Sequence, residues 1–287
     1  MNNNYPKLEP FNFLGLERQS YEKSKVVIFP VPYSSTTYWK SGTKDGPHAL
    51  IDASRRLELY DQETKKDISK VGIFTLEPLE PSKNSPLETI ERIEKVVNSL
   101  LKDKKFVITV GGEHSITFGT IRAFVKIFKN LSVLQFDAHT DLRDIFEGTK
   151  YHHGCVIRRV RELGIPVTQV GIRSLSKEEV NYIKREKIKT IFYAPELPIK
   201  EIIATLKKNV YITFDLDALD PSIMPSTGTP EPGGLQWYET LNLIKQISRQ
   251  RKIVGADIVE LDPTPGLHAP DFLAAKLVYK IIVYSVP

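Results

Sequence analysis

A short apolar run that ends abruptly in three potential metal ligands constrains the fold of this chain more than any other feature. The run, residues 131–136, has the length and composition of a strand buried in a parallel sheet. Asp137, His139 and Asp141 follow it. Because side chains alternate along a strand, Asp137 and His139 project the same way, and Asp141 follows as the chain leaves the sheet. In open α/β sheets, ligands bind at the carboxyl ends of the strands.

Two further apolar runs end in side chains of the same kind. Asp215 and Asp217 follow one of them directly, and the third candidate pair, Glu113 and His114, follows the other after two glycines. These side chains are too many for one ion. They suit two divalent cations about 3.5–4 Å apart, bridged by aspartates and a hydroxide, which is a known arrangement for hydrolysis. The mixture of imidazole and carboxylate fits several divalent metals, and the excess of carboxylates favours manganese.

Strand candidates alternate with helix candidates along the chain. We expect strands at 25–30, 71–75, 106–110, 131–136, 167–171, 190–193, 210–215 and 253–258. We expect helices at 47–59, 115–128, 152–163, 199–206, 237–247 and 270–286, and two more that begin with capping boxes at Ser85 and Ser176. This order predicts a mostly parallel sheet of about eight strands with helices on both faces. No break in composition divides the chain, so we expect one domain over 1–287, with 1–20 as an irregular arm.

Composition and charge exclude several classes of protein. The 40 basic and 35 acidic residues give a net charge of +5 without a concentrated basic block, so we expect no nucleic-acid partner. Residues 1–10 lack the apolar core of a signal peptide. The apolar stretch 272–286 contains Lys276 and Lys280 and is too short to span a bilayer. With a single cysteine no internal disulfide can form, and we expect a soluble, cytoplasmic protein that does not bind membranes.

The charge at the strand ends indicates the class of substrate. Two divalent cations bring +4, the four aspartates bring −4, and a hydroxide makes the sum −1. Glu260 follows the last predicted strand and therefore lies at the same edge. If Glu260 faces the metals, the pocket carries −2 and favours a cationic substrate; the alternative is a solvated loop acid. Asp257, inside that strand, is expected to be a hydrogen-bonded core acid.

Two roles compete at the segment that contains His153 and Cys155. His153 could carry protons to a leaving amine, as histidine does near neutral pH. Cys155 could instead be a nucleophile with a histidine base. A metal-activated hydroxide already supplies a nucleophile, so the role for His153 is favoured. His48 and His268 have no ligand-like neighbours in the sequence, and we expect them at the surface or at helix ends.

Several motifs resemble the signatures of the ureohydrolases, the arginase/agmatinase family. They are GGEHS at 111–115, FDAHTD at 136–141 and FDLDALDP at 214–221, together with PSTGTP at 225–230, the glycine pair at 233–234, and Glu260 followed by Pro263. The resemblance runs from about Gly42 to the C-terminus. It implies a three-layer α/β/α fold, a dinuclear manganese site, and hydrolysis of a guanidinium group to urea and an amine. Members of this family commonly form trimers or hexamers, which implies a homo-oligomer.

The resemblance also implies a role for each motif residue. One manganese ion would be held by His114, Asp137, Asp141 and Asp215, and the other by Asp137, His139, Asp215 and Asp217. Asp137 and Asp215 would bridge the two ions, and Asp141 would also orient the hydroxide. Glu260 would pair with the guanidinium, and His153 matches the proton-shuttling histidine of the family.

The stretch 142–159 resembles the agmatinase branch, and agmatine hydrolysis to putrescine and urea is the leading hypothesis. Arginases typically carry an asparagine where this chain has Arg143, and many agmatinases carry a serine where it has His152. Arg143 could recruit a carboxylate tail, as in guanidinobutyrate. An ion pair between Arg143 and Asp144 or Glu147 is the alternative.

Three other functions stay open. The first is an arginase or a guanidinobutyrase, which act on guanidino acids. The second is a single-zinc deacetylase of related fold, which is disfavoured because His114 and Asp141 complete a second metal site that such enzymes lack. The third is a metal-binding relative without catalytic activity, which is disfavoured because every expected ligand is present.

Overall fold

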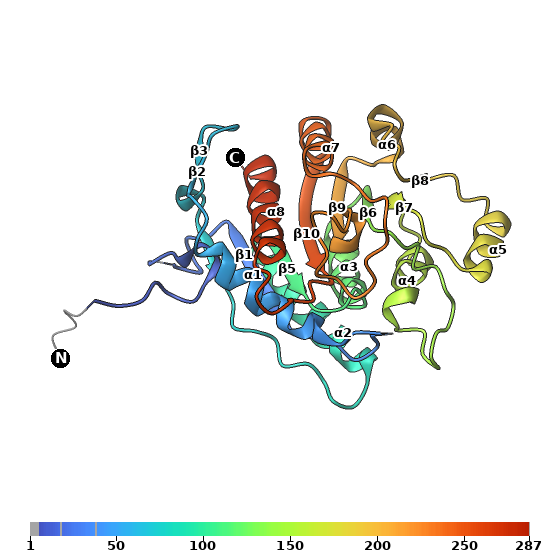
Figure 1. The fold of residues 1–287 in the computed structure, drawn as a ribbon, viewed down its shortest axis with the longest axis horizontal. Helices are drawn as coiled ribbons and strands as arrows, with labels where there is room; N and C mark the ends of the chain where they lie inside the picture. The colour runs from blue at the N-terminus through green and yellow to red at the C-terminus, as the bar shows by residue number, and fades with distance from the viewer. Residues whose placement is uncertain (1–5, 18, 38, 287) are drawn as a thin grey trace.

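The computed structural model describes residues 6–17, 19–37 and 39–286, and a parallel sheet of eight strands forms the centre of this part of the chain (Figure 1). The strands lie in the order β4-β1-β5-β10-β9-β6-β7-β8, and every neighbouring pair is parallel. Their bounds are β1 Val26–Val31, β4 Ile73–Thr75, β5 Phe106–Gly111, β6 Leu131–Phe136, β7 Val167–Ile172, β8 Ile191–Tyr193, β9 Asn209–Asp215 and β10 Lys252–Val259. The predicted parallel sheet is confirmed.

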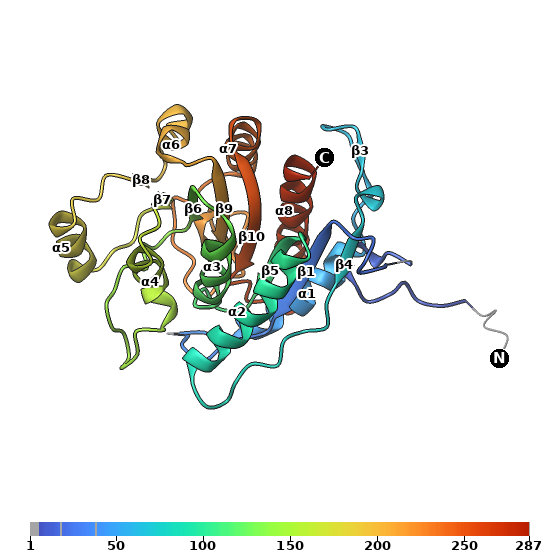
Figure 2. The same cartoon turned by 180° about the vertical axis from the view of Figure 1, so that it is seen from behind.

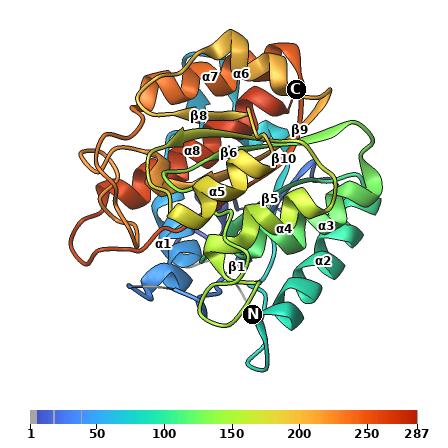
Figure 3. The ribbon, with the colours of Figure 1, turned by 90° about the vertical axis from the view of Figure 1, so that its right-hand side faces the viewer.

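Helices cover both faces of the sheet. They are α1 Gly46–Ser54, α2 Pro86–Lys102, α3 Ile116–Ile127, α4 Val156–Glu162, α5 Lys177–Arg185, α6 Ile199–Thr205, α7 Trp237–Gln250 and α8 Ala269–Ser285. Figure 3 shows α6, α7 and α8 on one side of the sheet and α2, α3 and α4 on the other. From behind, α2 lies alongside α3 (Figure 2). The three-layer α/β/α arrangement agrees with the fold that the sequence predicts. None of the described helices is both long and apolar enough to cross a membrane.

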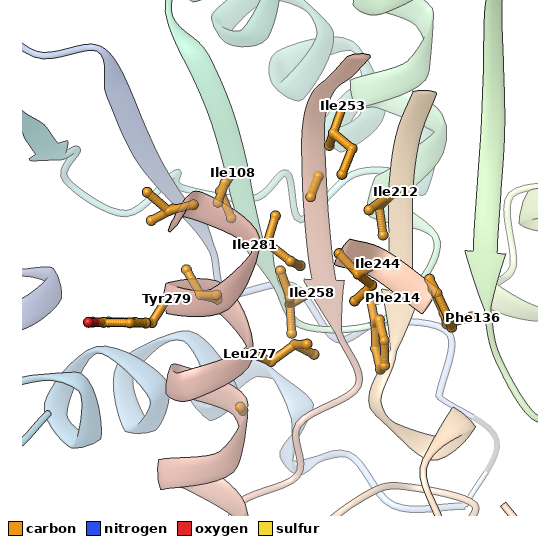
Figure 4. Close-up of a cluster of buried hydrophobic side chains, with 14 of the residues drawn as sticks. Ile108, Phe136, Ile212, Phe214, Ile244, Ile253, Ile258, Leu277, Tyr279 and Ile281 are labelled. Carbon is orange, nitrogen blue, oxygen red and sulfur yellow. The ribbon is translucent and has the colours of Figure 1, made fainter. Parts of the chain in front are cut away.

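Each helix layer forms its own hydrophobic core against one face of the sheet. On the α7 and α8 face, Ile212, Phe214 and Ile258 from the strands pack against Ile244 and other helix residues (Figure 4). On the other face, side chains of α2, α3 and α4 pack against alternate residues of the same strands. Burial on both sides explains why these strands read as continuous apolar runs in the sequence. The two cores hold the sheet rigid, so the strand ends provide a fixed platform for the site.

The two predicted capping boxes have different outcomes. The Ser176 hydroxyl accepts a hydrogen bond from the Glu179 amide, and the Glu179 carboxylate accepts one from the Ser176 amide, so this box is complete. The Ser85 hydroxyl accepts from the Glu88 amide at 3.2 Å, but the Glu88 carboxylate accepts from Ser82 instead. Both serines begin helices, as predicted, but only the first forms the reciprocal pair.

The main departure from the expected elements lies between α1 and β4. The helix predicted over 47–59 ends at Ser54, and the chain then forms a hairpin of β2 Tyr60–Asp61 and β3 Lys66–Asp67. Lys280 of α8 holds this hairpin through Asp61 at 2.6 Å and Glu63 at 2.9 Å. Strands of two residues are too short to show an alternation of apolar and polar side chains, so the sequence could not indicate them. The helix predicted over 152–163 begins at Val156, after a short 3₁₀ turn.

Candidate metal centre

Four neighbouring strands bring the predicted ligands to one edge of the sheet. β5, β10, β9 and β6 lie side by side and parallel, so their carboxyl ends meet. Each apolar run stops there, and the residues that follow it are polar. The ends of strands at opposite sides of the sheet could not converge in this way, so the strand order itself assembles the centre.

The first cluster surrounds the ring of His114. Its Nδ1 lies 3.1 Å from Asp137 Oδ2, 3.1 Å from Asp141 Oδ2 and 3.3 Å from Asp215 Oδ2. All four side chains are buried. The backbone of Asp141 has a φ of 52°, a left-handed conformation that is uncommon outside glycine. Such local strain is typical of functional sites, and here it occurs at a residue of the cluster.

The second cluster surrounds His139. Its Nδ1 lies 3.0 Å from Asp217 Oδ2 and 3.6 Å from Asp137 Oδ1. The ligand-type atoms of His114, Asp137 and Asp141, and those of Asp137, His139 and Asp217, each form a group that could hold a metal ion. Asp137 is therefore shared, with one carboxylate oxygen toward each histidine. All six predicted ligands therefore come together at this edge of the sheet.

Burial and mutual repulsion raise the pKa of two carboxyl groups in the first cluster. Burial and the neighbouring charge of Asp137 raise the pKa of Asp141 to about 7. Burial and the charges of Asp217 and Asp137 raise the pKa of Asp215 well above its usual value. Carboxylates so close together repel one another unless a cation lies between them. This charge balance fits divalent metal ions.

A relay of hydrogen bonds fixes the tautomer of His114. Thr213 donates its hydroxyl proton to Asp257 Oδ1 at 2.6 Å, so its oxygen accepts from His114 Nε2 at 2.8 Å. Nε2 therefore carries a ring proton, which leaves Nδ1 as the nitrogen that can bind a cation among the three aspartates. Nδ1 is buried and has no hydrogen-bond partner among the described residues. An imidazole nitrogen that faces three carboxylates, with the other ring nitrogen held by a hydrogen bond, is a geometry that suits a metal ligand. As expected, Asp257 is a hydrogen-bonded core acid.

Removing this relay is expected to weaken metal binding. In Thr213→Val the proton on His114 Nε2 loses its acceptor, and we expect metal affinity to fall by about 10–100-fold, the usual effect of such outer partners. Calorimetric titration of the metal-free protein with Mn²⁺ measures the change. The matched control is Thr168→Val, which removes another buried strand threonine whose hydroxyl pairs with Thr205 outside the centre. Equal affinities for the two variants would contradict the role of the relay.

Two buried glutamines also position the centre, and the sequence reasoning missed them. Gln135 Nε2 donates to Asp137 Oδ2 at 2.6 Å, and Gln169 Nε2 donates to Gln135 Oε1 at 2.6 Å and to the Thr140 carbonyl at 2.8 Å. The two glutamines are direct partners across β6 and β7. Their signal was present in the sequence, because a glutamine inside a fully buried apolar strand needs a polar partner.

Glu113, one of the candidate ligands, belongs to a different structure. Its carboxylate accepts hydrogen bonds from the amides of Ser35 and Thr36 at 2.6 and 2.7 Å, and from the hydroxyls of Thr36 and Ser115. These four donors turn the side chain away from both clusters. Glu113 anchors the loop after β1, and Thr36 of that loop accepts from the His153 amide at 3.2 Å. Through Thr36, Glu113 therefore links this loop to His153, which lines the pocket.

Glu260 faces the centre, as the sequence predicts. Its Oε1 accepts from the His114 amide at 2.6 Å, and its own amide donates to the Gly112 carbonyl at 2.8 Å. Its φ is 65°, so a second left-handed residue lies at this edge. Burial and the charge of Glu113 raise the pKa of Glu260 well above its usual value. The alternative of a solvated loop acid is wrong.

His153 and Cys155 lie in the same short turn but in different environments. His153 lines the pocket, and burial together with the nearby His152 lowers its pKa to about 3, so the ring is neutral. Cys155 is fully buried, and burial raises the pKa of its thiol to about 12. A thiol in that environment is not a nucleophile. His48 and His268 are exposed and lie outside the centre, as predicted.

Arg143 lines the same pocket but lacks the expected ion pair. Among the described residues, Asp144 pairs with Arg159 at 2.7 Å, and no ion pair joins Arg143 to Asp144 or Glu147. Its guanidinium instead lies 4.4 Å from the centre of the Phe146 ring. That ring meets His152 edge-on, and His152 contacts the ring of His153. Stacking, rather than a salt bridge, therefore holds Arg143.

These groups surround one pocket of about 450 Å³ at the carboxyl edge of the sheet. His139, Asp141, Asp215, Asp217 and Glu260 line it together with His153 and Arg143. Its volume lies within the range of about 300–1,000 Å³ that is usual for small-molecule sites. The geometry provides buried carboxylates and histidines in two groups, with an acid and a neutral histidine beside them.

Comparison with known proteins agrees with this geometry. The model of the arginase family matches residues 24–284, which include every residue of the two clusters. The chain belongs to the arginase family. The match covers the whole eight-stranded sheet and the helices around it, up to the last turn of α8.

Two related names recur among the relatives found by sequence. The chain is 40% identical to the N(1)-aminopropylagmatine ureohydrolase of Synechocystis sp. over 96% of its own length and 94% of that protein. It is 35% identical to the agmatinase of Halalkalibacterium halodurans over 93% of its length and 94% of that protein. Among solved structures, the agmatine ureohydrolase of Thermoplasma volcanium has a TM-score of 0.87 at 33% identity, over 97% of this chain and 94% of that one.

Proposed function

We propose that this arginase-family protein acts as one ureohydrolase domain of agmatinase type and hydrolyses agmatine to putrescine and urea. One water molecule is added across the bond between the guanidinium carbon and the alkyl nitrogen. The alkyl nitrogen leaves as an amine, and the carbon leaves as urea. The observation that carries the proposal is the pair of ligand clusters that share Asp137, with the Glu260 carboxylate in the same pocket.

The residues fit a pair of divalent cations. His114, Asp137, Asp141 and Asp215 would hold one, and Asp137, His139, Asp215 and Asp217 would hold the other. The excess of carboxylates over imidazoles favours manganese. When bound, the cations supply a water that is activated for attack at neutral pH.

Three residues of the pocket act on the substrate and the water. Glu260 pairs with the guanidinium, because its carboxylate lines the pocket and is anchored through the His114 amide. Asp141, at the edge of the first cluster, orients the attacking water. His153 lines the pocket, and its neutral ring could accept a proton at one nitrogen and pass the proton of the other nitrogen to the leaving amine.

N(1)-aminopropylagmatine is a second candidate substrate. The relatives from Synechocystis sp. and Thermus thermophilus, at 40% and 37% identity, have the name N(1)-aminopropylagmatine ureohydrolase. This compound differs from agmatine only in its tail, so the same reaction at the guanidinium yields spermidine and urea. The two clusters and Glu260 would act alike on both substrates.

The decisive experiment is urea release by manganese-loaded protein. Agmatine, N(1)-aminopropylagmatine, arginine and guanidinobutyrate are supplied in parallel, and metal content is measured on the same sample. We expect urea from agmatine, from N(1)-aminopropylagmatine, or from both, since these two have amine tails and no carboxylate. Preferential reaction with arginine or guanidinobutyrate would contradict the proposal and would assign Arg143 to a carboxylate tail. Manganese binding without urea from any guanidine would indicate an inactive relative, and one bound ion per chain would favour the deacetylase alternative.

A further inference from the structure

Glu231 is a pocket acid that the reaction itself does not use. It lies on the loop between β9 and α7 and lines the pocket beside Gly228 and Thr229. Its side chain is 38% exposed, whereas the aspartates of the two clusters are buried. Glu231 is therefore at the solvent side of the pocket, where the part of a substrate farthest from the reacting carbon would lie.

The other glutamates of the pocket are already committed. Glu179 accepts from the Thr140 hydroxyl at 2.7 Å, from the Leu142 amide at 3.0 Å and from the Ser176 amide at 2.8 Å. Glu260 accepts from the His114 amide. Among the described residues, the Glu231 carboxylate has one charged neighbour, His139, whose Nε2 lies 3.9 Å from its Oε1. That distance is too long for a hydrogen bond. Glu231 is thus the pocket glutamate with free acceptor capacity.

The backbone of Glu231 is held in place even though its side chain is not. Arg173 donates to the Glu231 carbonyl at 2.7 Å and to the Pro232 carbonyl at 3.1 Å. The same guanidinium donates to the Asp217 carbonyl at 2.7 Å, next to the second cluster. Gly233, two residues after Glu231, donates its amide to the Asp220 carboxylate at 2.9 Å. The loop is therefore fixed relative to the metal centre, which positions the carboxylate before a ligand arrives.

We propose that Glu231 binds the cationic tail of the substrate by accepting a hydrogen bond from a tail ammonium. This inference rests on the proposed function, and it explains how an enzyme of this kind selects a polyamine-type tail. The guanidinium would reach Glu260 at the clusters, and the tail would extend along the outer side of His139 toward Glu231. Two pocket cations, Lys40 and Arg143, come from other loops and would repel the tail, so Glu231 provides its one uncommitted anionic partner among the described pocket residues.

The test compares substrates that differ only in their tails. Wild type and Glu231→Gln are loaded with manganese and supplied with agmatine, N(1)-aminopropylagmatine and n-butylguanidine, which lacks the tail amine. We expect kcat/KM of the variant to fall about tenfold for the two charged substrates, mainly through KM, since a partly exposed charged hydrogen bond is lost. The loss is confined to charged tails, and Glu231→Asp is expected to recover part of it. Glu201→Gln removes an equal charge from an exposed position on α6, outside the pocket, as the matched control.

A different role for Glu231 gives a different result. If it acted by orienting His139, Glu231→Gln would raise the manganese concentration required for activity and would slow n-butylguanidine as much as agmatine. Either result, or unchanged kinetics with both charged substrates, would overturn the inference. If the wild type released urea from no guanidine, the proposed function would fail. Calorimetric binding of spermidine would then test the tail site separately, since wild type should bind it more tightly than Glu231→Gln.

Discussion

Replacing Asp137 with asparagine is expected to reduce urea release at least about a thousandfold. Asp137 places one carboxylate oxygen toward His114 and the other toward His139, so one substitution weakens both clusters. Metal ions contribute several kcal/mol to reactions of this kind, and each 1.36 kcal/mol is a factor of ten in rate. Asparagine keeps the shape of the side chain but removes its charge and one of the two oxygens. We also expect the purified variant to retain less manganese per chain.

The control separates this effect from a general loss of folding. Asp144→Asn neutralises an exposed acid in the loop after the same strand, where its partners are Arg158 and Arg159. The Asp144 side chain is 55% exposed and Arg159 keeps Glu162 as a second acidic partner, so this variant should keep near wild-type activity. Circular dichroism on both proteins verifies the fold. An Asp137→Asn protein that is as active as Asp144→Asn with full manganese content would show that the shared carboxylate is not a ligand.

The sheet and the position of the centre could be predicted because both follow from local patterns. Strands buried on two faces are mostly apolar, so each one ends visibly where charged residues such as Asp137 and Asp215 begin. Parallel strands also place all of these ends at one edge. A sequence that carries ligands after several such strands therefore indicates a site before any contact is known. The pattern places the six candidate ligands at this edge, together with Glu113.

The supporting contacts could not be predicted, because they join residues far apart in the chain. Glu113 resembles a ligand by position, but four donors from elsewhere in the fold turn it toward the loop after β1. One of the two roles considered for Arg143 is an ion pair with a neighbouring acid. Asp144 instead pairs with Arg159, and the Arg143 guanidinium stacks on the Phe146 ring. Such competition between partners depends on tertiary geometry.

Backbone conformation is the third kind of information that the sequence lacked. A Cβ added to Gly112 would lie 1.9 Å from the Tyr33 carbonyl oxygen, so only glycine allows the loop after β1 to approach this closely. Asp141 and Glu260 are not glycines, yet both have positive φ values. Both residues line the pocket, and local backbone strain of this kind is typical of functional sites.

The second large effect is expected from Glu260→Gln, which should lower kcat/KM for agmatine about a hundredfold or more. Truncating one member of a desolvated charge pair costs about 2–5 kcal/mol, and the pair between Glu260 and a guanidinium would be of this type. Glutamine retains an oxygen that can accept from the His114 amide, so the contact that anchors the side chain is preserved. We therefore expect manganese content and thermal stability close to those of the wild type.

Separating a direct role from an indirect one requires metal content and activity on the same samples. If Glu260 acts on the substrate, Glu260→Gln loses activity but keeps its manganese. If it acts only through His114, both fall together, because the amide of that ligand is its hydrogen-bond partner. Asp262→Asn is the matched control, since this acid lies two residues further along the same loop and does not line the pocket. Activity of Glu260→Gln within tenfold of that control would exclude a guanidinium ion pair, because the cost of losing such a buried pair is larger.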